Sequence, residues 1–147
     1  MKHARRSALV AAALVLLSRA AGAVQSDDAD DQALTADADY VAGLAALKAD
    51  DAATALRHFQ SALKRFPDAA NLHNELGFTH RKLRQMDKAF EHYKRALALK
   101  PEHRGAHEYI GEAYLMVGDV ASANKHLDAL RKICLLPCDE LEDLRKA

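Results

Sequence analysis

Tryptophan is absent from this chain of 147 residues, and only four phenylalanines and four tyrosines are present. Half of the residues are nevertheless hydrophobic, and alanine and leucine dominate them, so the core must consist of small and aliphatic side chains. The length allows one domain. The sequence contains neither a catalytic set of nucleophile, base and acid at a familiar spacing nor a glycine-rich phosphate loop. It therefore predicts no enzyme, no cofactor and no metal site.

An excess of basic residues is also missing, since the formal net charge of the chain is zero. The first 23 residues contain Lys2, Arg5, Arg6 and Arg19 and no acidic residue. The rest of the chain therefore carries a net charge of −4. A mildly acidic body argues against nucleic-acid binding, which requires a basic surface.

Residues 1–23 have the pattern of a bacterial secretory signal peptide. A basic start is followed by the apolar run 8–17 and by Ala21-Gly22-Ala23, which fits an A-x-A cleavage site. The run is shorter than the roughly 20 apolar residues that span a bilayer. The sequence predicts a periplasmic protein that begins at Val24 and has no membrane span after cleavage.

Residues 24–35 include Asp27, Asp28, Asp30 and Asp31, with few side chains suited to burial. A calcium loop would need a glycine and a closing glutamate that this segment lacks. We expect a disordered acidic leader here.

Residues 36–135 repeat with a period of 34 residues. Gly43, Gly77 and Gly111 coincide at this shift, and other small residues, aromatics and the closing Pro67 and Pro101 recur in the same order. The second half of each unit carries apolar residues at the i, i+3, i+4, i+7 spacing of an amphipathic helix. Glycine inside a helix costs about 1 kcal/mol relative to alanine. Three glycines at one register therefore predict a close approach by a neighbouring helix.

This pattern resembles the tetratricopeptide repeat (TPR) family. It departs from the family at the large aromatic near the start of each unit, where Asp39, His73 and His107 stand. The resemblance implies an all-α fold, a solenoid of three helical hairpins with a C-terminal capping helix. The expected units are residues 36–69, 70–103 and 104–137, followed by a cap at 138–147.

The third unit differs from the first two. Asn124 stands where Leu56 and Phe90 occur in the earlier units, and Arg131 stands where they have leucine. Polar residues at these positions indicate that the array ends here. Leu141 and Leu144 then supply a narrow apolar stripe for a cap.

Cys134 and Cys138 are the only cysteines, and they lie at the junction between the third unit and the cap. An even number of cysteines in an oxidising compartment implies a disulfide. The alternative is a thiol redox or copper-handling site with Met116 or His126 nearby. The three-residue gap differs from the C-x-x-C of redox enzymes.

Seven histidines follow the leader, and His73 and His107 are equivalent in the repeat. His103 and His107 have no acidic partner at a zinc-motif spacing. We expect these side chains to be solvated or half-buried.

The family's groove positions lie on the first helix of each unit, and the resemblance implies a partner-binding concave face there. Carried over residue by residue, they are Asp37, Tyr40, Leu44, Lys48, Asn71, Asn74, Phe78, Arg81, Glu108, Glu112, Leu115 and Met116. Phe78 lies off the apolar stripe of its helix and is the expected anchor. The carboxylate clamp of some TPR domains is absent, because its places hold Tyr40, Leu44, Glu75, Gly105 and Tyr109.

The sequence thus predicts a periplasmic module that binds a protein or peptide partner and is a monomer or a weak homo-oligomer. Two alternatives stay open, the thiol or copper protein and a structural subunit that self-assembles through its repeats.

Overall fold

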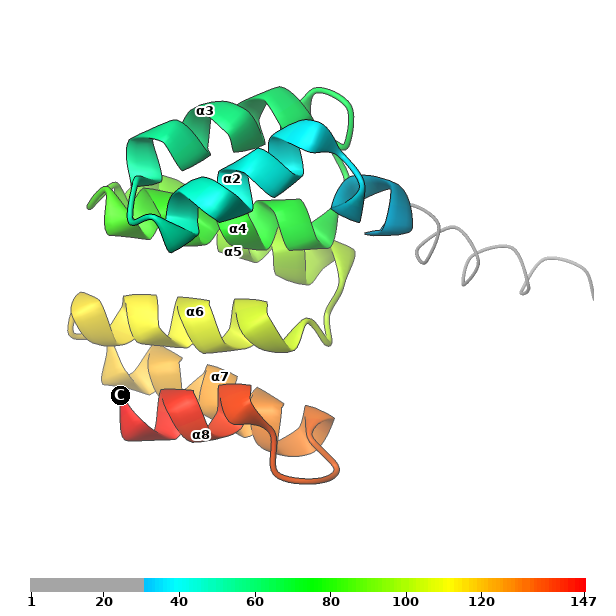
Figure 1. The fold of residues 1–147 in the computed structure, drawn as a ribbon. Helices are drawn as coiled ribbons and strands as arrows, with labels where there is room; N and C mark the ends of the chain where they lie inside the picture. Colours follow the sequence, from blue (N-terminus) through cyan, green and yellow to red (C-terminus); the bar gives the residue numbers. More distant parts are fainter. Residues whose placement is uncertain (1–30) are drawn as a thin grey trace, which may run out of the picture.

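The computed structural model describes residues 31–147, and every regular element in that range is helical. A short helical turn at residues 31–35 precedes the array, which Figure 1 shows as stacked pairs of antiparallel helices. The helices are α2 (Ala38–Lys48), α3 (Ala52–Leu63), α4 (Ala70–Lys82), α5 (Met86–Leu99), α6 (Arg104–Met116), α7 (Val120–Ile133) and α8 (Asp139–Lys146). The predicted all-α solenoid of three hairpins with a C-terminal helix is confirmed.

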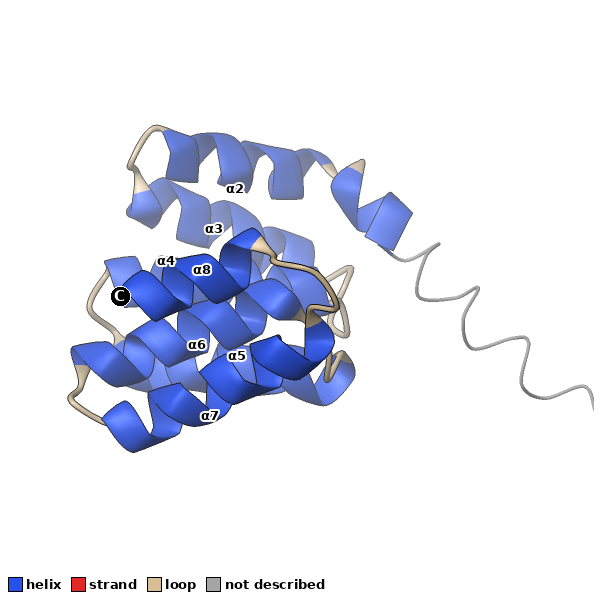
Figure 2. Ribbon diagram, turned by 90° about the horizontal axis from the view of Figure 1, so that it is seen from below, coloured by secondary structure: helices blue, strands red, loops and turns tan. Residues whose placement is uncertain are grey.

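Each hairpin packs on the next through its second helix, so α3 contacts α4 and α5 contacts α6. The last helix, α8, lies against both α6 and α7 (Figure 2). Two hydrophobic clusters result. One, between the first two hairpins, centres on Phe59, Leu72 and Leu76. The other, between the second and third hairpins, centres on Tyr93 and Ile110.

The repeated glycines are the points of closest approach, as predicted. A Cβ atom on Gly43 would meet the ring of Phe59, and one on Gly77 would lie 2.5 Å from the ring of Tyr93. At Gly111 the nearest side chain is Leu144 of α8, whose Cδ2 would lie 2.6 Å from such an atom. The cap therefore fills the place that an aromatic ring fills in the first two hairpins.

Aspartates begin three of the helices. Asp37, Asp51 and Asp119 each accept a hydrogen bond from the backbone N–H three residues later, at 3.0, 2.9 and 2.9 Å. Such caps satisfy N–H groups that have no partner inside the helix. The caps fix where α2, α3 and α7 start, and so set the register of the hairpins.

The first helix of every hairpin ends in a left-handed residue at one register. Asp50 and Arg84 have φ of 60°, and Gly118 has φ of 80°. The following residue donates a backbone hydrogen bond of 2.9 Å to a carbonyl five positions earlier in all three turns. This bonding satisfies carbonyl groups at the end of the helix, and only Gly118 adopts the conformation without strain from a Cβ atom.

The predicted leader 24–35 is wrong for its last five residues. Residues 31–35 are helical, and the Leu34 side chain is completely buried in the first hydrophobic cluster. Asn71 also donates a 2.9 Å hydrogen bond to Asp31. A single leucine among acidic residues is enough to dock this turn, because it covers apolar surface at the end of the array. Residues 24–30 and the predicted signal peptide at 1–23 lie outside the described range.

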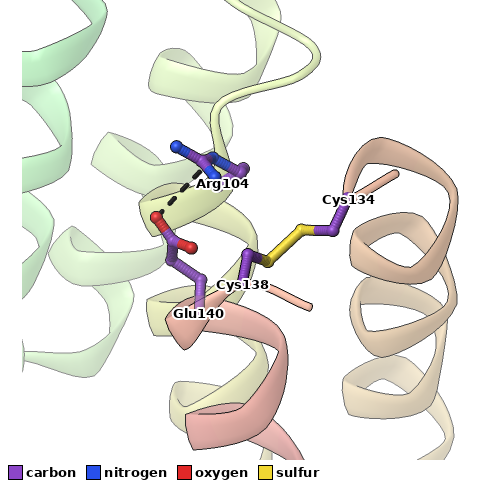
Figure 3. Close-up of a disulfide and its surroundings, with 4 residues drawn as sticks. All are labelled: Arg104, Cys134, Cys138 and Glu140. Atoms are coloured by element: carbon purple, nitrogen blue, oxygen red, sulfur yellow. Dashed lines mark ion pairs between the residues drawn. A yellow bond between two sulfur atoms is a disulfide. The ribbon is translucent and has the colours of Figure 1, made fainter. Parts of the chain in front are cut away.

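The junction before the cap is held in two ways (Figure 3). Cys134 and Cys138 form a disulfide, as predicted, with their Cα atoms 6.1 Å apart. Arg104 at the start of α6 pairs with Glu140 at the start of α8, with 3.6 Å between Nε and Oε1. Leu144 then packs completely enough to leave only 4% of its surface exposed. The C-terminal segment is therefore an integral part of the third hairpin's packing.

Candidate functional site

The first helices of the three hairpins, α2, α4 and α6, carry all the predicted partner-binding residues. We call the surface formed by these residues the inner face. Of the twelve residues, Leu44, Lys48 and Met116 are exposed. A further seven are half-buried: Asp37, Asn71, Phe78, Arg81, Glu108, Glu112 and Leu115.

Tyr40 and Asn74 are buried, and not exposed as expected for a partner-binding face. Only 7% of Tyr40 and 5% of Asn74 are exposed, and the Tyr40 ring packs 5.9 Å from that of Phe59. Each residue precedes a repeated glycine by three positions. Residues three apart lie on the same side of a helix. Tyr40 and Asn74 therefore face the same closely packed neighbour as Gly43 and Gly77. The sequence contained this signal in the position of Gly43 and Gly77.

The central feature of the inner face is a group of two rings and one guanidinium. The rings of Phe78 and Tyr109 are 5.0 Å apart, and the guanidinium carbon of Arg81 lies 5.2 and 5.5 Å from their centres. Arg81 Nη1 also pairs with Glu112 Oε2 at 2.7 Å. Phe78 belongs to neither hydrophobic cluster. The exposed edge of the half-buried Phe78 ring is thus available to a partner. The charge of Arg81 is already paired with Glu112.

A surface hollow of about 720 Å³ adjoins this group at the carboxyl-terminal ends of α4 and α6. Phe78, Lys82 and Met116 line it together with Ala52 at the start of α3. Met116 is 48% exposed, and Leu44 on α2 is 39% exposed. Accessible apolar side chains beside a hollow are typical of surfaces that bind another molecule.

Two carboxyl groups near the middle of α4 and α6 lack a cationic partner among residues 31–147. Burial raises the pKa of Glu75. Burial, and then the charges of Glu112, Asp143 and Glu140, raise the pKa of Glu108 to about 7. Sequence reasoning considered Glu75 only as a departure from the carboxylate clamp and missed its burial. Glu108 occupies the register of Tyr40 and Asn74, which explains why it is partly buried.

The remaining polar candidates already have structural roles. Asp37 caps α2 and pairs with Arg65 at 2.7 Å, and Arg65 holds the pKa of the Asp37 carboxyl below its usual range. Asn71 donates to Asp31, as described above. These contacts within the chain explain the presence of Asp37 and Asn71, so a binding partner is not needed to explain them.

Three side-chain pairs between hairpin helices follow the 34-residue period and were not predicted. Asp39 pairs with His58 at 3.0 Å, and the equivalent contacts in the next hairpins join His73 to His92 and His107 to His126, each with 2.9 Å between Nδ1 atoms. These pairs replace the family's large aromatic near the start of each unit. Individual histidines were visible in the sequence, but their spacing of 19 residues has meaning only once the hairpin turn is known.

The hydrogen bonds fix the protonation of the two histidine pairs. Nε2 of His73 lies 2.9 Å from the carbonyl oxygen of Pro67, so that nitrogen must carry a proton. Nδ1 of a neutral His73 is then an acceptor, and His92 Nδ1–H donates to it. His107, Pro101 and His126 repeat the arrangement. Burial, and then the paired histidine, lower the pKa of His92 and of His126 to about 4.

The structure does not assemble the copper site considered from sequence. Both thiols are consumed in the disulfide. Met116 is at the opposite end of α6 from Arg104, about 18 Å along the axis from the end that contacts the cap. His126 is about 12 Å along α7 from Cys134 and bonds His107. Within the described residues, no three His, Cys, Asp or Glu side chains are placed to hold a metal ion. No helix between residues 31 and 147 is long and apolar enough to span a membrane.

An array of helical hairpins with an accessible face on its first helices defines a helical-repeat protein. A family model described as tetratricopeptide repeat matches residues 40–103 and 79–134, and the chain belongs to this family. A comparison with curated protein sequences gives no match.

Solved structures with the same fold include a complex with a peptide. The TPR2B domain in the pHsp70 complex of yeast Sti1 has a TM-score of 0.62 and 23% identity, over 65% of this chain and 76% of that one. The first TPR of Spaghetti (RPAP3), bound to the HSP90 peptide SRMEEVD, has a TM-score of 0.64 and 16% identity, over 83% and 90%. A mutant form of MamA has a TM-score of 0.60 and 20% identity, over 77% and 86%. At these identities the similarity shows the fold alone.

Proposed function

We propose that this tetratricopeptide-repeat protein acts in the bacterial periplasm and holds a partner protein or peptide on its inner face. The observation that carries the proposal is the accessible apolar surface on the inner face, that of Phe78 and Met116 at the 720 Å³ hollow and that of Leu44 on α2. A packed array has no need to leave such side chains uncovered on one face. The proposal assigns the protein no catalytic step.

A peptide fits this surface because α2, α4 and α6 present side chains from successive hairpins side by side. An extended chain that crosses them can place an apolar residue against Phe78 and into the hollow. The pHsp70 complex of Sti1 and the HSP90-peptide complex of RPAP3 support binding of this kind by the same fold.

Site-specific photo-crosslinking tests the proposal in the compartment where the protein acts. A crosslinking residue is introduced at Met116 or Leu44 on the inner face, and at exposed Ala98 on α5 as the control. We expect one partner to be captured from the inner positions and not from Ala98. Capture of that partner only from Ala98 would show that the inner face is the wrong surface.

The Phe78→Ala variant then measures the anchor. We expect this variant to reduce the binding free energy of the captured partner by about 1–3 kcal/mol, the usual range for a central aromatic contact. Phe78 packs on Tyr109 and Arg81 outside both hydrophobic clusters, so the loss of folding free energy should be smaller than for a core truncation. A loss of several kcal/mol in folding would make Phe78 a core residue and remove the main argument for the site.

A further inference from the structure

The carboxyl groups of Glu75 on α4 and Glu108 on α6 have no cation within ion-pair distance in the described part of the chain. Glu75 is one turn before Phe78 and Glu108 directly precedes Tyr109, and the rings of Phe78 and Tyr109 are 5.0 Å apart. Burial, and then the charges of Glu108 and Glu75, raise the pKa of Tyr109 to about 12. Removing a carboxylate from water without a partner is costly. Glu75 and Glu108 are both half-buried, on helices that contact each other.

Asn74 is a second and independent sign that a donor is missing here. Its side chain is 95% buried, and its Nδ2 donates to Glu75 Oε1 at 3.3 Å, so its amide lies against this carboxyl group. Its Oδ1 is buried with no hydrogen-bond donor. Buried amide oxygens in folded proteins are almost always satisfied. An N–H group brought from outside the chain would satisfy Asn74 and pair with Glu75.

The neighbouring rings suit a cationic group. Arg81 already places its guanidinium within 5.2 and 5.5 Å of the ring centres of Phe78 and Tyr109, which shows that this surface accommodates a cation over its aromatic side chains. Arg81 is paired with Glu112. Neither Glu75 nor Glu108 has a cation of its own within ion-pair distance among residues 31–147.

We propose that the inner face binds a basic segment of the partner protein, with a lysine or arginine side chain of that segment placed between Glu75, Asn74 and Glu108. This inference rests on the proposed function and specifies its partner class. Arginine fits best, because its guanidinium carries several N–H donors in a plane and can bond a carboxylate and an amide oxygen together. The charge requirement is opposite to that of the acidic peptide SRMEEVD in the RPAP3 complex.

Fluorescence anisotropy with two synthetic probes tests the charge class. One is a short labelled peptide of arginines and leucines, and the other has glutamate at every arginine position. We expect the arginine peptide to bind and the glutamate peptide to fail. Glu75→Gln and Glu108→Gln should each weaken binding about tenfold, the effect of losing one buried charge-assisted contact.

Glu91→Gln is the matched control, because Glu91 is exposed on α5 and its replacement removes the same charge from the opposite helix layer. It should leave affinity unchanged. Thermal unfolding supplies a second readout. Glu75→Gln should unfold at the same or a higher temperature, because a neutral amide is cheaper to bury than a carboxylate. Weakened binding together with retained stability distinguishes a binding role from a structural one.

Each contrary result has a separate meaning. Equal weakening by Glu91→Gln would show a response to net charge alone and overturn the site. Equal binding of both peptides would overturn the basic class and leave the proposed function intact. Binding of neither peptide also overturns the inference. The proposed function is decided independently by crosslinking at Met116 and Leu44.

Discussion

His73 and His92 face each other with 2.9 Å between their Nδ1 atoms, and only one proton can occupy that contact. The carbonyl oxygen of Pro67 holds the proton of neutral His73 on Nε2. The proton in the contact therefore belongs to His92, and His73 Nδ1 accepts it. A proton added to His73 would go to Nδ1 and place two N–H groups against each other, so His73 must be neutral for the hydrogen bond to form.

The first prediction concerns acid stability. The folded-state pKa of His92 and His126 is lowered from 6.5 to about 4, so the unfolded chain binds more protons between these values. The contribution of each pair is complete above pH 6.5 and is lost as the pH falls towards 4. We expect a loss of roughly 1–3 kcal/mol per pair, since one pKa unit corresponds to about 1.4 kcal/mol.

Chemical denaturation across this pH range measures the effect. His92→Phe keeps a ring against His80, which stacks on His92, and should flatten the pH dependence. His58→Phe is the control, because the partner of His58 is the Asp39 carboxylate, which accepts a hydrogen bond from either form of the ring. Identical pH profiles for wild type and His92→Phe would contradict the assignment.

The second prediction concerns the glycine seam. In an open helix, Gly→Ala gains about 1 kcal/mol. A Cβ atom at Gly77 would lie 2.5 Å from the Tyr93 ring, so Gly77→Ala should instead destabilise the protein by about 1–3 kcal/mol. Gly111→Ala meets the end of the flexible Leu144 side chain and should loosen α8 alone. Thermal unfolding and hydrogen exchange distinguish the two, and a higher melting temperature for Gly77→Ala would refute the close packing.

The third prediction compares two alanines on α5. Ala89 is completely buried in the second cluster, whereas Ala98 is exposed. Ala89→Glu should unfold the array, because a buried charge without a partner costs several kcal/mol. Ala98→Glu adds the same side chain to the same helix and should fold normally. Circular dichroism decides the matter, and a native helical spectrum for Ala89→Glu would be the contrary result.

The fourth prediction concerns the disulfide. Replacement of both Cys134 and Cys138 by serine should cost roughly 2 kcal/mol, the chain-entropy estimate for so short a loop. Hydrogen exchange should accelerate in residues 138–147 and stay unchanged in the first two hairpins, since stability in a solenoid is nearly a sum over neighbours. Reductant should have this effect on wild type and none on the double variant. Loss of partner binding at unchanged stability would favour the redox alternative.

The fifth prediction concerns export. We expect the exported protein to begin at Val24, since Ala21-Gly22-Ala23 fits a signal-peptidase site. Amino-terminal sequencing of the exported protein provides the test, with Ala23→Arg as a variant that should remain uncleaved. An intact Met1 on wild-type protein in the membrane fraction would rule out the cleavage.

The repeat made most of the fold predictable from sequence. The position of Gly77 predicted the close approach of a neighbouring helix, because glycine is costly inside a helix. Asn124 and Arg131 are exposed, as expected at the end of the array. The partner side chain at Gly111 could not be predicted, because Leu144 lies outside the repeat and reaches it only through the turn at the disulfide.

The candidate site was harder to predict than the fold. The helical positions were right, but exposure depends on which neighbour covers each one. Tyr40 turned inward with Gly43, and Arg81 was paired by Glu112 from another hairpin. Glu75 is a candidate only because neighbouring helices bury it, and the sequence of a single helix does not predict that burial.

The packing of Leu144 on Gly111 also covers the carboxyl-terminal end of the array. A fourth hairpin, or the first hairpin of another molecule, would have to pack on the surface that α8 already covers. The Cys134–Cys138 disulfide joins the end of α7 to the start of α8 and keeps α8 close to this surface. Another helical hairpin could therefore stack on this end of the array only if α8 were displaced.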